Sequence, residues 1–319
     1  MTEKFSATVK SLLTEVRQLA KSPVTLEIGS DRAGYLRHDQ SYQERSADGS
    51  LKVVVADVTN VDYTASHELL HLLLSQQHYP QIHFNLTTHD HDLDQQLEAT
   101  AVELYHAAVH VPIVAVQKQR GIIDDTVQAQ YLKGIETVVP PEDPAKNDRL
   151  LIFRTLTLLD ALVFYQGQPA TAKKVLTARY PIAYQGAEQL YQILADKPID
   201  SPFTLRRAVV KLFAAFDQWL ANVGLAQTHH NQFVTLDGVF SQRQTHLEVR
   251  QLFQILHSEL TLRDNKRSAY IGLGKNDQQN TFVLSAPQAE KKRADFFKQI
   301  YGQKITDFLQ KQHLPLLIR

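Results

Sequence analysis

The chain has 319 residues, 43% of them apolar, which is enough to bury two compact cores or one large one. Its 34 basic and 34 acidic residues give a formal net charge of zero, which excludes attachment to nucleic acid or to anionic lipid through overall charge. The chain contains no cysteine, and this excludes disulfides and thiolate metal ligands.

The N-terminal segment predicts an amphipathic helix. Apolar residues recur at helical spacing between Phe5 and Leu19, with charged residues between them. The segment lacks the unbroken apolar stretch of a signal peptide, and no window reaches the roughly 20 apolar residues of a membrane span. We therefore expect a soluble, cytoplasmic protein that contacts neither membrane nor nucleic acid.

A small sheet is predicted next. Residues 24–28 alternate between apolar and polar, and extended segments follow at 35–36 and 42–45. Asp48-Gly49 is typical of a tight hairpin turn, and residues 51–58 are the clearest strand in the sequence. We predict a small, mostly antiparallel sheet that ends near residue 58.

Two strong helices follow the sheet. The first begins at Asn60 or Asp62 and continues to about residue 77, before Pro80. The second runs from about Leu93 to His110 and is expected to end at Pro112, because proline cannot donate the backbone hydrogen bond. Further helices are predicted over residues 112–119 and 124–136.

A proline-rich segment, residues 138–147, marks the predicted domain boundary, with one domain at 1–140 and a second at 146–319. The second domain is predicted to be mainly helical, with short strand pairs near 232–241 and at 269–271 with 281–284. Its predicted helices are 146–166, 169–178, 183–195, 202–222, 244–258 and 286–311. The predicted fold class is α+β: a small antiparallel sheet packed on the active-site helices, then a mainly helical second half.

Residues 67–71 read His-Glu-Leu-Leu-His and lie within the first predicted helix. Residues four apart share one face of a helix, so His67 and His71 can bind a single metal ion. Zinc accepts such nitrogen ligands and keeps one position for water in catalytic sites. Glu68 is then placed to take a proton from that water as the catalytic base. The domain at 1–140 is therefore predicted to be a zincin-like metallopeptidase domain.

A third protein ligand is needed, because two histidines alone hold zinc weakly. We expect it to be Glu98, which lies on the second strong helix beside Leu97 and Ala99. Glu103, further round the same helix, is the alternative. The same nitrogen and oxygen ligands also accept Mn, Fe or Co in place of zinc.

Several other polar residues lie near these segments. Tyr105 and His106 are seven and eight residues beyond Glu98, about two helical turns, where they could hydrogen-bond a ligand or stabilise a transition state. His89 and His91 lie in a polar loop that could bind zinc opportunistically. We prefer the interpretation that an aspartate of this loop, Asp92 or Asp94, caps the next helix.

In these motifs the chain resembles the ImmA/IrrE family of bacterial metallopeptidases. The similar segments are A-S-H-E-L-L-H-L-L-L at 65–74, L-E-A-T-A-V-E-L-Y at 97–105 and Val111-Pro112. In that family a strand leads into the His-Glu-x-x-His helix, and a later helix that opens with Glu-Ala supplies the third zinc ligand. The family usually has glycine where Leu70 stands, and Asn or Asp where Thr100 stands.

The resemblance covers about residues 1–120 and implies that His67, His71 and Glu98 bind zinc, with Glu68 as general base. It also implies an intracellular endopeptidase that cuts a regulatory protein, such as a helix-turn-helix repressor. The whole chain is further similar to a group labelled IpaB/EvcA, a label that implies no mechanism. Two functions stay open from the sequence: a zinc endopeptidase with a protein or peptide substrate, and a metal-binding or scaffold protein without activity.

Overall fold

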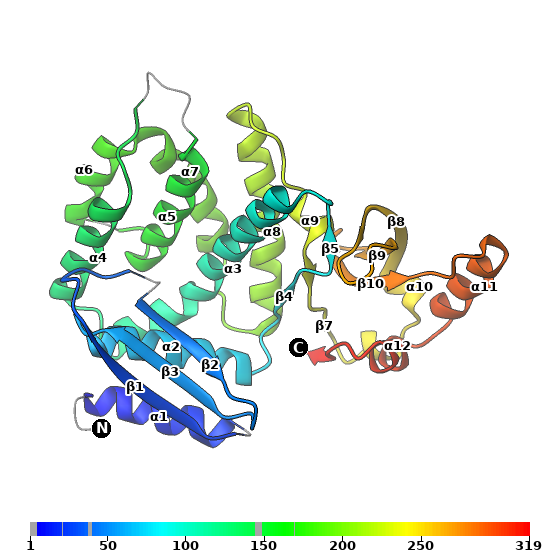
Figure 1. Cartoon of the computed structure of the whole chain (residues 1–319), viewed down its shortest axis with the longest axis horizontal. Coiled ribbons are helices and arrows are strands. Elements are labelled where there is room, and N and C mark those ends of the chain that lie inside the picture. The colour runs from blue at the N-terminus through cyan, green and yellow to red at the C-terminus, as the bar shows by residue number, and fades with distance from the viewer. Residues whose placement is uncertain (1–4, 21, 38–39, 144–148, 169) are drawn as a thin grey trace. The chain divides into compact units, whose positions relative to one another are not determined.

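The computed structural model describes residues 5–20, 22–37, 40–143, 149–168 and 170–319 and has the predicted α+β fold (Figure 1). The chain forms two compact units, each made of two separate segments. The first unit comprises Met1–His78 and Val109–Tyr191, and the second comprises Tyr79–Ala108 and Gln192–Arg319. The units therefore do not follow the predicted boundary at 138–147, since both sides of that segment belong to the first unit.

Residues 140–143 are tied to helices of their own unit instead of joining two domains. The Arg154 guanidinium donates hydrogen bonds to the carbonyls of Pro140 and Pro141, at 2.6 and 2.9 Å. The Glu142 carboxylate accepts the backbone N–H groups of Ile182 and Ala183 at 2.8 and 2.6 Å, which satisfies the start of a helix. The rest of the predicted linker, residues 144–147, lies outside the described residues.

The first unit combines a three-stranded sheet with several helices. Its elements are α1 (Ala7–Leu19), β1 (Val24–Asp31), β2 (Ser41–Arg45), β3 (Leu51–Asp57), α2 (Val61–Gln76), the C-terminal part of α3 (His91–Gln119), α4 (Asp125–Val138), α5 (Leu151–Phe164), α6 (Ala170–Arg179) and α7 (Pro181–Ala195) up to Tyr191. The strand order is β1-β3-β2, so the largely buried β3 is central and β2 is an edge strand. Helix α2 packs against β3, β2 and α1.

The sheet is mixed, which corrects the expectation of a mostly antiparallel one. β2 and β3 form the predicted antiparallel hairpin, and Gly49 has the positive φ of 84° that its turn requires. β1 instead runs parallel to β3, with Val24 opposite Leu51. The connection from β1 to β2 crosses the sheet, so β1 pairs with the other edge of β3.

Helix α3 continues through Pro112 and ends at Gln119. The prediction that the helix ends at Pro112 is therefore wrong. Proline removes one backbone hydrogen bond, but Ala108, Ile113 and Val114 around it are buried and hold the helix in its core. By length and composition α3 could also cross a membrane, although half of its most apolar window is buried inside the protein.

The second unit contains an antiparallel sheet with the order β10-β9-β8-β5. Its elements are β4 (Ile82–His83), β5 (Leu86–Thr87), the N-terminal part of α3, α8 (Pro202–Asn222), α9 (His230–Phe233), β6 (Thr235–Leu236), β7 (Val239–Phe240), the 3-10 helix η3 (Gln244–His246), α10 (Val249–Leu252), β8 (Phe253–Leu262), β9 (Ser268–Gly274), β10 (Asn280–Ser285), α11 (Glu290–Tyr301), α12 (Ile305–Lys311) and β11 (Leu317–Ile318). Buried aromatic residues from β7, β8, β10 and α12 form its core: Phe240, Phe253, Phe282 and Phe308.

The predicted helix 244–258 is replaced by two short helical turns, η3 and α10, and by the start of strand β8. Val249, Leu252, Phe253 and Leu256 fit a helical period, but only α10 is an α-helix, and β8 begins at Phe253. β8 pairs with β9 from Phe253 opposite Gly274 onward. Pairing with a distant segment decides the conformation of a short apolar stretch, and local periodicity does not report it.

Candidate metal centre

Helix α2 places His67 and His71 side by side on one face. The helix begins directly after β3, and the Asn60 side chain accepts the N–H of Tyr63 at 3.1 Å, as predicted for the N-cap. His67 is only 7% exposed, and the two Nε2 atoms lie 3.1 Å apart. The sequence spacing therefore produces the expected histidine pair.

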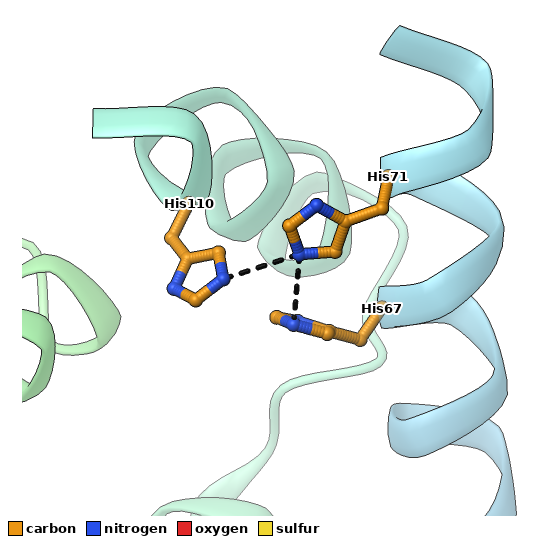
Figure 2. Close-up of side chains that lie close together, drawn as sticks. All are labelled: His67, His71 and His110. Atoms are coloured by element: carbon orange, nitrogen blue, oxygen red, sulfur yellow. Dashed lines mark hydrogen bonds between the residues drawn. The ribbon is translucent and has the colours of Figure 1, made fainter. Parts of the chain in front are cut away.

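His110, from helix α3, completes a group of three histidines (Figure 2). Its Nε2 lies 3.2 Å from Nε2 of His71, and one nitrogen of each ring lies within 4.8 Å of the others. Nitrogen ligands at 2.0–2.1 Å from a tetrahedral zinc ion are separated by about 3.3–3.4 Å. The two measured separations are close to that value, so the rings need little movement to bind one ion.

A buried glutamine fixes the register between the two helices. Gln117 lies two turns beyond His110 on α3 and is fully buried. Its side-chain amide donates to the Tyr63 carbonyl at 3.1 Å and to the Ser66 hydroxyl at 2.8 Å, both on α2. These hydrogen bonds hold α3 against α2 so that His110 faces the histidine pair.

Asp160 orients His110 through the ring nitrogen that faces away from the other two histidines. The His110 Nδ1 lies 2.5 Å from Oδ1 of Asp160, and the Tyr131 hydroxyl donates to the other carboxylate oxygen at 2.7 Å. Burial, and then the charge of Asp160, raise the pKa of the Tyr131 hydroxyl well above its usual value, so it remains a donor. The arrangement places the His110 proton on Nδ1 and leaves Nε2 as an acceptor toward His67 and His71.

The donor set of this centre suits a divalent cation. The three imidazoles bring one ring nitrogen each to a common point, and a neutral imidazole nitrogen without a proton offers a lone pair. A metal ion accepts all three lone pairs at once. Three protein ligands with a fourth position left for water is the pattern of catalytic zinc sites.

The predicted base, Glu68, is held by the edge strand β2. Its carboxylate accepts hydrogen bonds from the Ser41 hydroxyl at 2.7 Å and from the Gln43 side-chain amide at 2.9 Å, one on each oxygen. The donors are neutral and each carboxylate oxygen can accept more than one hydrogen bond. Glu68 is thus oriented and keeps acceptor capacity for a further proton donor.

Glu98, the predicted third ligand, is not part of the histidine group. Its carboxylate is paired with Arg263 within the second unit. Glu98 also lies twelve residues before His110 on the same continuous helix, which corresponds to roughly 18 Å along the axis. The third member of the group is His110 instead. The alternative, Glu103, is exposed and is not in the group either.

The other predicted site residues also lie in the second unit. The Tyr105 hydroxyl donates to the Pro80 carbonyl at 3.0 Å, and His106 is its neighbour, with the ring centroids 5.9 Å apart. His89 is bonded to the Thr261 hydroxyl, and the start of α3 is capped by Asp90. Neither Asp92 nor Asp94 makes that cap; the Asp94 carboxylate accepts from Thr87 and Thr88.

Sequence reasoning missed His110 and Asp160, although each carried a signal. His110 stands between Val109 and Val111 in an apolar helix, and Asp160 stands between Leu159 and Ala161. A polar side chain in such a position is buried and needs a partner. Two such polar residues in separate predicted helices, His110 and Asp160, could have been predicted to bind each other.

No protein-family model, no curated protein and no solved structure matches this chain. The resemblance to the ImmA/IrrE family thus depends on the quoted residues alone.

Replacing Asp160 by asparagine is expected to weaken zinc binding by roughly 10–100-fold, since the variant loses the charged partner of His110. Competition titration with a zinc chelator measures this. Asp125, an exposed acid on α4, provides the matched Asp125→Asn control. Equal zinc affinity in both variants would show that Asp160 does not act on His110.

Proposed function

We propose that this chain is a zinc-dependent hydrolase that cleaves peptide bonds. The observation that carries the proposal is the convergence of one ring nitrogen from each of His67, His71 and His110. Glu68 follows the first of these histidines in the sequence. Three converging imidazoles, two of them buried and one half-buried, suit a metal ion. A glutamate that follows the first of these histidines in the sequence suits the role of a base for a metal-bound water.

Each residue has a distinct role in the proposed reaction. His67, His71 and His110 would hold the ion, which when bound supplies a water of lowered pKa and polarises the scissile carbonyl. Glu68 accepts the proton of the attacking water and passes it to the leaving amine. Ser41 and Gln43 keep the Glu68 carboxylate in place, and Asp160 keeps His110 in the tautomer that binds metal.

The position of Glu68 favours a peptide as substrate. Its two hydrogen-bond partners lie on β2, which is the edge strand of the sheet. An edge strand offers backbone N–H and C=O groups to which an extended peptide can pair. On the family resemblance, the proposed substrate is a cytoplasmic regulatory protein such as a helix-turn-helix repressor.

One observation favours a second candidate, a metal-binding protein without activity. The carboxylate of Glu68 is bonded through both oxygens to β2, so it also ties α2 to the sheet. Under this alternative the metal stabilises the fold and Glu68 is a structural residue. The two candidates share the metal and differ only in turnover.

Metal removal tests the proposal. Purified protein is expected to carry about one zinc ion per chain, measured by inductively coupled plasma mass spectrometry. A peptide library should be cleaved, cleavage should stop with 1,10-phenanthroline, and added zinc should restore it. At zinc concentrations of about 1,000 Kd the ion also adds about 4 kcal/mol of stability, visible by calorimetry. Protein without any divalent metal would exclude both candidates, and cleavage that survives metal removal would exclude the first.

A further inference from the structure

A pocket of about 490 Å³ lies within the second unit, far along the chain from the histidines. It is formed by α10, the start of β8, the turn after β9 and the C-terminal end of α11. Small-molecule sites have volumes of roughly 300–1,000 Å³, so this pocket is large enough for a metabolite. The side chains that line it are Arg250, Phe253, Gln254, Lys275, Lys298 and Tyr301.

The lining is strongly basic. Among the described residues the lining contains three cations and no acid. Glu248, just outside, binds Nε of Arg250 at 2.7 Å, and the two terminal nitrogens of that guanidinium have no acceptor among the described residues. Lys298 has no carboxylate partner in the described part of the chain, and Lys275 uses one of its three donors on the Arg250 carbonyl, at 2.6 Å. Most of the cationic donors are thus available to an anion.

Two aromatic residues give the pocket an apolar part and a further donor. Phe253 is 4% exposed and packs edge-on against Phe282, which fixes its ring. The Tyr301 hydroxyl accepts the N–H of Ile255 at 2.8 Å, so its own proton is left to donate. An anion bound here would therefore have an apolar surface beside it.

We propose that this pocket binds a phosphorylated small molecule with an apolar ring. A phosphate carries two negative charges and three terminal oxygens, which match an arginine fork, two lysines and a hydroxyl better than one carboxylate does. The ring of the ligand would lie against Tyr301, the more exposed of the two aromatic side chains. This ligand is separate from the peptide substrate and does not depend on the metal centre.

The test compares Lys298→Glu with Lys292→Glu. Both lysines are exposed on α11, but only Lys298 lines the pocket, so the two variants have the same charge change on the same helix. Phenyl phosphate is the probe, with inorganic phosphate and phenol as its two parts, and binding is followed by phosphorus line broadening and ring-proton saturation transfer. Thermal midpoints check that both variants are folded.

Phenyl phosphate is expected to bind the natural protein at least about tenfold tighter than either part, and Lys298→Glu should weaken it about tenfold or more. Lys292→Glu should bind as the natural protein does. Because phosphate also binds metal ions, the titrations use preparations of equal zinc content. Equal affinity in the two variants, or phenyl phosphate binding no better than inorganic phosphate, would overturn the proposal.

Discussion

Replacing His110 by alanine is expected to abolish stoichiometric zinc binding, whereas replacing Glu98 by alanine leaves it intact. The His110 Nε2 lies 3.2 Å from that of His71, while the Glu98 carboxylate is paired with Arg263. Removing a direct ligand leaves only two imidazoles, so affinity should fall by more than the roughly 10–100-fold loss expected from an outer partner such as Asp160. Zinc content by mass spectrometry and a chelator competition measure both variants.

The control for this pair is His106→Ala, which removes a histidine from the same helix without touching the group of three. Because His110 is 5% exposed, its variant could lose zinc through misfolding, so His110→Gln is measured beside it. Glutamine retains a donor toward Asp160 and most of the volume. Full zinc content in either His110 variant, together with loss of zinc in Glu98→Ala, would show that Glu98 and not His110 is the third zinc ligand.

The histidine pair was predictable because its geometry is local. His67 and His71 are four residues apart, and the helical period alone brings them to one face. Which residue of α3 faces this pair depends instead on the point along α3 at which the two helices are in contact. Gln117, which bonds to Tyr63 and Ser66, fixes that contact near the C-terminal end of α3. Glu98 is therefore too far from it along the helix.

The expectation that Pro112 ends the helix contributed to the same error. A helix that stops there leaves His110 in its last turn, where side chains are usually exposed and the backbone frays. The actual helix runs a further seven residues beyond Pro112, to Gln119, and His110 lies in its buried part. Burial by a neighbouring helix thus decides both the helix end and the ligand.

Strand pairing limited the prediction of the fold in the same way. The β2–β3 hairpin was predicted from Asp48-Gly49, since a short turn fixes its own partner strands. The parallel pairing of β1 with β3, and the pairing of β8 with β9, join segments that the turn residues do not specify. α+β was predictable, while strand order and the two discontinuous units were not.

Replacing Glu68 by glutamine is expected to keep the zinc and to lower kcat for peptide cleavage by about 10²–10⁴-fold, the usual contribution of a general base. The amide cannot take a proton from water at neutral pH. It can still accept from the Ser41 hydroxyl, and Gln43 can turn its amide to present its carbonyl oxygen to the new side chain. The measurement is kcat and KM on a cleaved library peptide, with zinc content determined on the same sample.

Ser41→Ala separates the catalytic role of Glu68 from its role in tying α2 to the sheet. It removes the 2.7 Å hydrogen bond and leaves the carboxylate, so activity should fall only modestly, while unfolding free energy drops by about 1 kcal/mol. If Glu68 is a base, Glu68→Gln loses far more activity than Ser41→Ala at similar stability. If Glu68 only ties α2 to the sheet, the natural protein has no peptidase activity. Both variants then lose stability, and neither shows a change in peptide cleavage. A zinc-loaded Glu68→Gln variant that cleaves peptides at the natural rate would therefore exclude the proposed mechanism while leaving the metal centre in place.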